Sequence, residues 1–244
     1  MKSLFRTAAA AALLAGTAMT PALAQGYDIL SGPTGYQAGD IMTHISLIGV
    51  IPENMDSHVS APGLGVGNMS GTRLGITSGV SPELDASYFL TKNLSIQLIA
   101  ATSRHTITAG GGELSKITHG GSYTLGSAWV VPPTLTAQWH LPQIGVVRPY
   151  VGVGLTVAFF YGVSPSADLN SALGLPGTSK LGLRTAIGPS FEAGFDVPVT
   201  GNWTVNVDVK QMVLPTVGRV DHGAVHAMTG LNPTVVGFGV GYKF

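Results

Sequence analysis

At residues 203–210 the chain reads Trp-Thr-Val-Asn-Val-Asp-Val-Lys, which is the clearest indication of its fold. The odd positions are apolar, and the even positions are polar or charged. Because successive side chains of a β-strand point to opposite faces, the alternation predicts a strand with one apolar and one polar face. Asp208 and Lys210 lie on the polar face, so that face needs water or polar partners.

The same two-residue period recurs along the rest of the chain. Seven further segments carry it, the last two more weakly: Phe191–Val199, Leu94–Ala101, Thr134–Leu141, Val147–Tyr161, Val235–Phe244, Asp40–Ile51 and Pro82–Leu90. With residues 203–210 they make eight strands, and bacterial membrane barrels contain an even number of strands. We therefore predict an all-β fold, an eight-stranded antiparallel transmembrane β-barrel.

The connections between these segments alternate in length. Three are short turns, at residues 91–93, 142–146 and 200–202. Four are long and rich in Gly, Ser, Thr and Pro, at residues 52–80, 106–126, 162–187 and 213–231. This alternation is typical of outer-membrane barrels, which have short periplasmic turns and longer extracellular loops.

Composition favours a lipid environment. Charged residues make up 10% of the chain, against roughly 25% in ordinary soluble domains, and the mean hydropathy is +0.34. A soluble β-sandwich or a lipocalin-like barrel would show similar alternation, but it would need a more highly charged surface. Acidic and basic residues balance at 12 each, so no nucleic-acid partner is expected. The absence of cysteine excludes disulfides, cysteine-based zinc sites and a lipoprotein anchor.

The N-terminus has the three parts of an export signal. Lys2 and Arg6 precede an apolar run over residues 7–16, and Ala22-Leu23-Ala24 forms a cleavage pattern before Gln25. An uncleaved membrane anchor is the alternative, but the run of about ten residues is short beside the roughly 20 that a spanning helix needs. We predict a signal peptide at residues 1–24 and a barrel domain at residues 25–244.

Several short motifs resemble the OmpW family of outer-membrane proteins in their order and spacing. They are Gly35–Asp40, Pro82–Asn93, Leu135–His140, Arg148–Gly154, Asn202-Trp203, Asn232-Pro233 and Gly241–Phe244. The resemblance implies a barrel in the cell outer membrane with a narrow, largely apolar channel for small hydrophobic molecules. It also implies that the terminal Phe244 is the signal read by the barrel-assembly machinery. We expect a monomer in contact with outer-membrane lipid.

The inward positions divide by height, because eight strands enclose an interior that side chains nearly fill. Near the periplasmic end we place a polar plug consisting of Asp40, His44, Gln97, Gln138, His140, Arg148, Asp196 and Lys243. Near the extracellular end we place an apolar pocket consisting of Ile48, Val50, Ile99, Ala101, Ala158 and Phe160. Five further charged residues are expected midway or higher, where they interrupt the apolar surface: Glu83, Asp85, Glu192, Asp208 and Lys210.

This arrangement predicts that a small apolar molecule enters from outside, is stopped by the plug and leaves sideways into the bilayer. Pro132, Pro133 and Pro189 lie where strands meet long loops. Proline cannot donate a ladder hydrogen bond, so a gap in the wall is expected there. The alternative is a non-transporting surface barrel with a receptor, adhesion or envelope-integrity role, in which inward charges and glycines only complete the interior.

No catalytic, cofactor or metal motif is present. The sequence contains neither Gly-x-Ser-x-Gly nor His-Glu-x-x-His. His105 and His119 lie near serines, but nothing in the sequence orders them into a catalytic site. His222 and His226 lie near Asp221, and we interpret them as solvated loop histidines rather than metal ligands. We therefore predict no enzyme, no cofactor and no metal site.

Overall fold

A computed structural model describes residues 35–53, 58–61, 66–68, 71–112, 122–166, 181–220 and 225–244. The strands are β1 Ile41–Ile51, β2 His58–Ala61, β3 Val66–Asn68, β4 Arg73–Ile76, β5 Gly79–Phe89, β6 Leu94–Ala101, β7 Ser103–Gly110, β8 Tyr123–Val131, β9 Thr134–His140, β10 Arg148–Pro165, β11 Leu181–Leu183, β12 Ala186–Thr200, β13 Trp203–Met212, β14 Leu214–Val220, β15 Val225–Leu231 and β16 Thr234–Lys243. Within these ranges no helix is long and apolar enough to cross a membrane.

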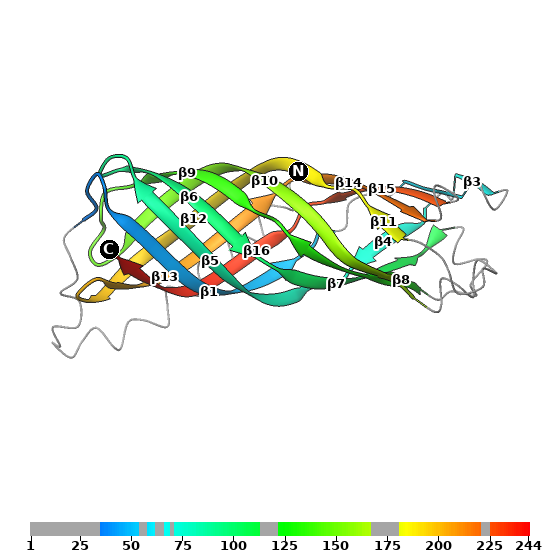
Figure 1. The fold of residues 1–244 in the computed structure, drawn as a ribbon, viewed down its shortest axis with the longest axis horizontal. Coiled ribbons are helices and arrows are strands. Elements are labelled where there is room, and N and C mark those ends of the chain that lie inside the picture. Colours follow the sequence, from blue (N-terminus) through cyan, green and yellow to red (C-terminus); the bar gives the residue numbers. More distant parts are fainter. Residues whose placement is uncertain are drawn as a thin grey trace.

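Eight of the strands close into a barrel, which confirms the predicted fold (Figure 1). Around the wall they follow the order β1-β5-β6-β9-β10-β12-β13-β16, and every neighbouring pair is antiparallel. The first and last strands form the closing seam, where Ile45 pairs with Val240. Closure gives every wall strand a hydrogen-bonded neighbour on both sides, so most backbone groups of the wall are paired within it.

The predicted strand positions agree with these eight strands to within a few residues, but parts of the long segments that were expected to be loops are strands. On one side of the mouth the wall continues upward as the upper half of β10, β8, β7 and β4, which pair in that order. On the other side, β11, β14, β15, β2 and β3 form a separate five-stranded sheet. Alternation is weak in these Gly- and Ser-rich stretches, which is why their sequence did not reveal the strands.

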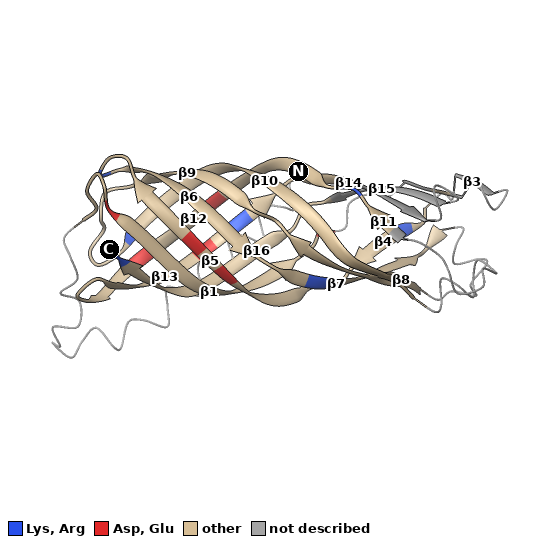
Figure 2. Ribbon diagram, viewed as in Figure 1, with Lys and Arg blue, Asp and Glu red and all other residues tan. Residues whose placement is uncertain are grey.

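Burial along the wall follows the predicted faces. In β13 the residues at 204, 206, 208, 210 and 212 are buried, and those between them are half-buried or exposed. The outward face is apolar, with Ile45 70% and Leu47 62% exposed, as a lipid-facing surface requires. Figure 2 shows that the charged residues of the barrel strands gather in the middle of the barrel and toward its short-turn end.

Aromatic side chains mark both rims of the wall. At the short-turn rim the rings of Trp203 and Tyr242 lie 4.9 Å apart between centroids, and Tyr242 also packs on Phe244. At the loop rim Trp129 stacks on Tyr161. Aromatic girdles of this kind lie at the two membrane interfaces of outer-membrane barrels.

Of the two chain ends, the structure describes the C-terminal one. The predicted signal peptide at residues 1–24 lies outside the described residues. At the other end the backbone N–H of Phe244 donates to the carbonyl of Ile41, and its side chain is 67% exposed. The last residue is therefore fixed to the seam by its backbone, and its ring faces outward at the rim.

Candidate functional site

The candidate site is the barrel lumen, which consists of two zones. Inward positions in the lower and middle barrel are almost all polar, and inward positions near the loop end are almost all apolar. The two zones arise because the inward face of each strand changes character along its length. On β1, for example, the inward side chains run from His44 and Ser46 to Ile48 and Val50.

Lys210 is the centre of the polar zone. Its Nζ atom donates to Glu83 Oε1 at 2.7 Å and to Asp208 Oδ1 at 2.6 Å, and it lies 4.0 Å from Glu192 Oε1. Three carboxylates on three different strands therefore surround one ammonium group. All four side chains are 2–3% exposed, so the ion pairs stand in for hydration by water.

A second group is centred on Asp196. Its carboxylate accepts from the Tyr36 hydroxyl at 2.7 Å and from Asn206 Nδ2 at 2.9 Å. His44 lies between two carboxylates, with Nδ1 2.8 Å from Asp85 and Nε2 3.2 Å from Asp196. His44 thereby links strands on nearly opposite sides of the polar zone.

Neutral side chains extend this network to the remaining wall. Gln138 donates to Glu192 Oε2 at 3.2 Å and accepts from the hydroxyls of Ser87 and Ser95. Ser95 is also 2.9 Å from His140 Nε2. The network therefore reaches around the barrel from β12 to β5, β6 and β9.

The lowest layer closes the periplasmic end. Tyr36, in the segment before β1, stacks on Phe89 with ring centroids 4.2 Å apart, and His140 packs on both rings. Arg148 lies over the Tyr36 ring and donates to Gln143. Lys243 is hydrogen bonded to Asp40 at 3.1 Å. Aromatic packing and charge pairing together obstruct a straight path through the barrel.

The predicted plug residues lie in this zone. His44, Gln97, Gln138, His140, Arg148 and Asp196 are buried, whereas Asp40 and Lys243 are partly exposed at the lower rim. The five charged residues expected midway lie together in the upper part of the polar zone, between the predicted plug residues and the pocket. Of these, Glu83 reaches the pocket lining. The polar zone as a whole is called the plug from here on.

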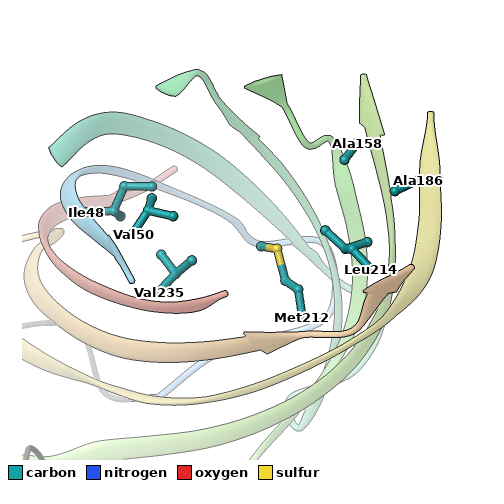
Figure 3. Close-up of a cluster of buried hydrophobic side chains, with 7 residues drawn as sticks. All are labelled: Ile48, Val50, Ala158, Ala186, Met212, Leu214 and Val235. Atoms are coloured by element: carbon teal, nitrogen blue, oxygen red, sulfur yellow. The ribbon is translucent and has the colours of Figure 1, made fainter. Parts of the chain in front are cut away.

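The apolar zone is one pocket that faces the loop end. It encloses about 1120 Å³ of space, part of it open solvent at the mouth. The structure places all six predicted pocket residues in its lining: Ile48, Val50, Ile99, Ala101, Ala158 and Phe160. Figure 3 shows the buried apolar cluster around it, to which Ala186, Met212, Leu214 and Val235 also contribute.

The pocket extends beyond the barrel into the upper strands, which sequence reasoning missed. Leu74, Ile76, Ile107 and Leu183 line it from strands that were expected to be loops. Ser103 and His105 also line it, as the first inward residues of β7. The only sequence signal for these two was their spacing of two residues beyond Ala101, which continues the inward face of β6.

The wall beside the pocket has a break. Pairing between β6 and β9 ends at Ile99 and Thr134, and pairing between β7 and β8 starts at Ser103 and Val130. Residues 100–102 and 131–133 lie between, and Pro132 and Pro133 cannot donate hydrogen bonds there. Pro132 lines the pocket. At Pro189, in contrast, the wall continues, because its carbonyl accepts from the N–H of Val213.

In the part of the chain that the structure describes, no three acidic or histidine side chains form a metal site. His119 and His222 lie outside the described residues, as does the side chain of His226.

The comparisons with known proteins agree with this architecture. The OmpW family model matches residues 37–244. Outer membrane protein W of Vibrio cholerae is 29% identical over 213 residues, covering 86% of this chain and 90% of that protein. The outer-membrane protein y4mB of Sinorhizobium fredii is 31% identical over 200 residues, covering 81% and 76%. The crystal structure of OprG from Pseudomonas aeruginosa superimposes with a TM-score of 0.74 at 24% identity, covering 86% of this chain and 98% of that one.

Proposed function

Because the chain belongs to the OmpW family of outer-membrane barrels, which are not enzymes, we propose that it is a passive channel for small hydrophobic molecules. The observation that carries the proposal is the apolar pocket, which opens toward the loop end and is closed below by the plug. The protein resides in the cell outer membrane, so the open end faces the exterior. The predicted pocket residues, Ile48 and Phe160 among them, would form the binding surface.

Binding would be driven by burial of apolar surface, at about 25 cal/mol for each Å² removed from water. Polar solutes would gain nothing from this lining and would lose their hydration. The plug supplies the second element of selectivity, since Lys210 is already paired with carboxylates of the lumen. An apolar molecule moving down would have to separate these charges, which costs several kcal/mol.

Lateral exit into the bilayer is the route that remains. The break at Pro132 lies at the height of the pocket and separates two sections of paired wall. A small displacement of residues 100–102 from 131–133 would open a path without breaking hydrogen bonds between β6 and β9. The bilayer outside the wall is as apolar as the pocket, so release there costs little.

The test is uptake of a small apolar solute by proteoliposomes, with a sugar of similar size as the control. Entry should be faster for the apolar solute alone. Phe160→Asp and Ile48→Asp should slow that entry, and Phe160→Leu should retain it because the lining stays apolar. Folding of each variant is checked by the heat-dependent shift in gel mobility. Equal uptake by folded wild type and folded Asp variants would refute the channel.

The alternative is a non-transporting surface barrel with a receptor, adhesion or envelope-integrity role. The observation in its favour is that strands extend beyond the barrel mouth, as β8, β7 and β4 on one side and as the separate five-stranded sheet on the other. Identical entry of both solutes with and without the protein would favour this role.

A further inference from the structure

The pocket lining contains two polar side chains that contact one another. Ser103 and His105 are 7% and 9% exposed and lie on the inward face of β7, among apolar residues such as Ile107 and Ala128. The Ser103 hydroxyl oxygen lies 2.8 Å from His105 Nε2. Neither side chain belongs to the plug, whose nearest member at the pocket floor is Glu83.

The direction of the hydrogen bond between them is fixed by a third group. His105 Nδ1 lies 2.7 Å from the carbonyl oxygen of Thr77, and a carbonyl only accepts, so Nδ1 carries the proton. When Nδ1 holds the only ring proton, Nε2 is an acceptor. Ser103 must therefore donate its single hydroxyl proton to His105. The Ser103 oxygen, which keeps its lone pairs, presents an acceptor to the pocket and no donor.

The surrounding backbone holds this acceptor in place. Thr77 and Thr106 are tied by two hydrogen bonds, from the N–H of Thr77 to the carbonyl of Thr106 and from the N–H of Thr106 to Thr77 Oγ1. The His105 ring lies close to Gly79, where an added Cβ would come within 3.4 Å of Cε1. A polar group fixed before the ligand arrives gives orientation at low entropic cost.

We infer that the pocket binds apolar molecules with one hydroxyl group, such as aliphatic alcohols and phenols, and that Ser103 Oγ accepts the ligand's hydroxyl proton. The inference rests on the proposed channel function and names its ligand class. Alkanes fill the same lining without using the acceptor. Ketones and ethers of the same size place a second acceptor against Ser103, which is repulsive, so the site discriminates against them.

The experiment measures dissociation constants for 1-octanol, 2-octanone and octane in lipid nanodiscs that contain the protein, with empty nanodiscs subtracted. Ser103→Val removes the hydroxyl, covers His105 Nε2 with a methyl group and leaves the bond to Thr77 intact. Octanol affinity should fall about fivefold, the value of a neutral hydrogen bond of about 1 kcal/mol. Octane affinity should not change, and the affinity for 2-octanone should stay or rise.

A second variant and a control keep the test decisive. The double variant Ser103→Ala/His105→Phe gives an entirely apolar wall and should show the same selective loss. Ser81→Ala removes another buried serine hydroxyl, which donates to the Thr102 carbonyl. Ser81 does not line the pocket, so this variant should bind octanol like the wild type.

The two proposals fail in different ways. Suppose that the wild type binds octane. If Ser103→Val then lowers the affinities for octanol and octane equally, or lowers neither affinity, the hydroxyl inference is overturned and the channel proposal stands. If wild type binds none of the three molecules, the channel proposal falls and the inference falls with it.

Discussion

The Nζ atom of Lys210 lies 2.7 Å from Oε1 of Glu83 in the middle of the barrel, and both side chains are 2% exposed. Asp208 and Glu192 also lie within 4.0 Å of this atom, so one ammonium group forms ion pairs with three carboxylates. An ion pair this deeply buried adds little net stability, but removing one partner leaves charges with no compensation.

We therefore expect Lys210→Met to be strongly destabilising, by about 3–5 kcal/mol, because three carboxylates would remain in the lumen without a cation. The measurement is urea unfolding of the barrel in lipid vesicles. The matched control is Lys243→Met, which breaks a partly exposed pair with Asp40 and should cost about 1 kcal/mol. Similar losses for the two variants would contradict the role given to Lys210.

A hydrogen bond on the outside of the wall crosses the break beside the pocket. The hydroxyls of Thr102 and Tyr161 are 2.9 Å apart, although Thr102 lies between β6 and β7 and Tyr161 lies on β10. Strands β8 and β9, which follow one another along the chain and both pair with β10, run between them. This bond therefore fastens residues 100–102 over the break at Pro132 and Pro133.

Tyr161→Phe removes this fastening and should speed release of a fluorescent apolar solute from the pocket into the bilayer. The bond is worth about 1 kcal/mol, which sets an upper limit near fivefold. Stopped-flow transfer into quencher-containing vesicles measures the rate. Tyr88→Phe makes the same change on a lipid-facing tyrosine of β5 and should have no effect. Equal release from all three proteins would argue against exit at this break.

Two glycines on β16 leave room for side chains that face them. An added Cβ at Gly237 would lie 2.6 Å from Asp208 Oδ2, and one at Gly239 would lie 2.8 Å from the Ile45 carbonyl oxygen. The interior at this height is full, as expected for eight strands.

Gly239→Val should destabilise the barrel by about 1–3 kcal/mol through overpacking, seen as a lower midpoint of urea unfolding. Gly49→Ala is the control, because its Cβ would meet only the Val236 carbonyl at 4.0 Å, and it should change stability by less than about 0.5 kcal/mol. A neutral Gly239→Val would show that the lumen is looser than this packing indicates.

The terminal residue is the predicted signal for the assembly machinery, and its exposed ring suits that role. Phe244→Ala should lower the amount of barrel inserted in the outer membrane of cells, while protein refolded in vitro keeps nearly wild-type stability. Phe238→Ala removes a lipid-facing ring of β16 that is 58% exposed and should insert normally. Equal insertion of the two variants, measured by immunoblot of outer-membrane fractions, would remove the special role of Phe244.

The faces of all eight wall strands follow from the sequence, because the period of two assigns every residue to lipid or lumen without knowledge of its neighbours. Heights in the lumen follow from strand direction alone, and this placed Ile48 and Phe160 near the mouth. Both steps use only local order along the chain.

Partners across the lumen could not be predicted in this way. Which carboxylates contact Lys210 depends on the register of strands far apart in sequence, and a shift of two residues would exchange Glu83 for Asp85 without changing any face. Tyr36 precedes the first strand, so periodicity says nothing of its place against Phe89. Ser103 and His105 were missed as a pocket pair because the segment around them has too few apolar residues to reveal a strand.

The plug also has a consequence for how the barrel forms. Tyr36 and Asp196 are 160 residues apart in sequence, His44 and Asp196 are 152 apart, and Lys210 and Glu83 are 127 apart. Such high contact order makes folding slow. A chain stopped before the last strands would present unpaired carboxylates beside an open edge, which lipid cannot solvate. Half-inserted forms are therefore high in energy, and insertion becomes a single cooperative event in which sheet closure and charge neutralisation coincide.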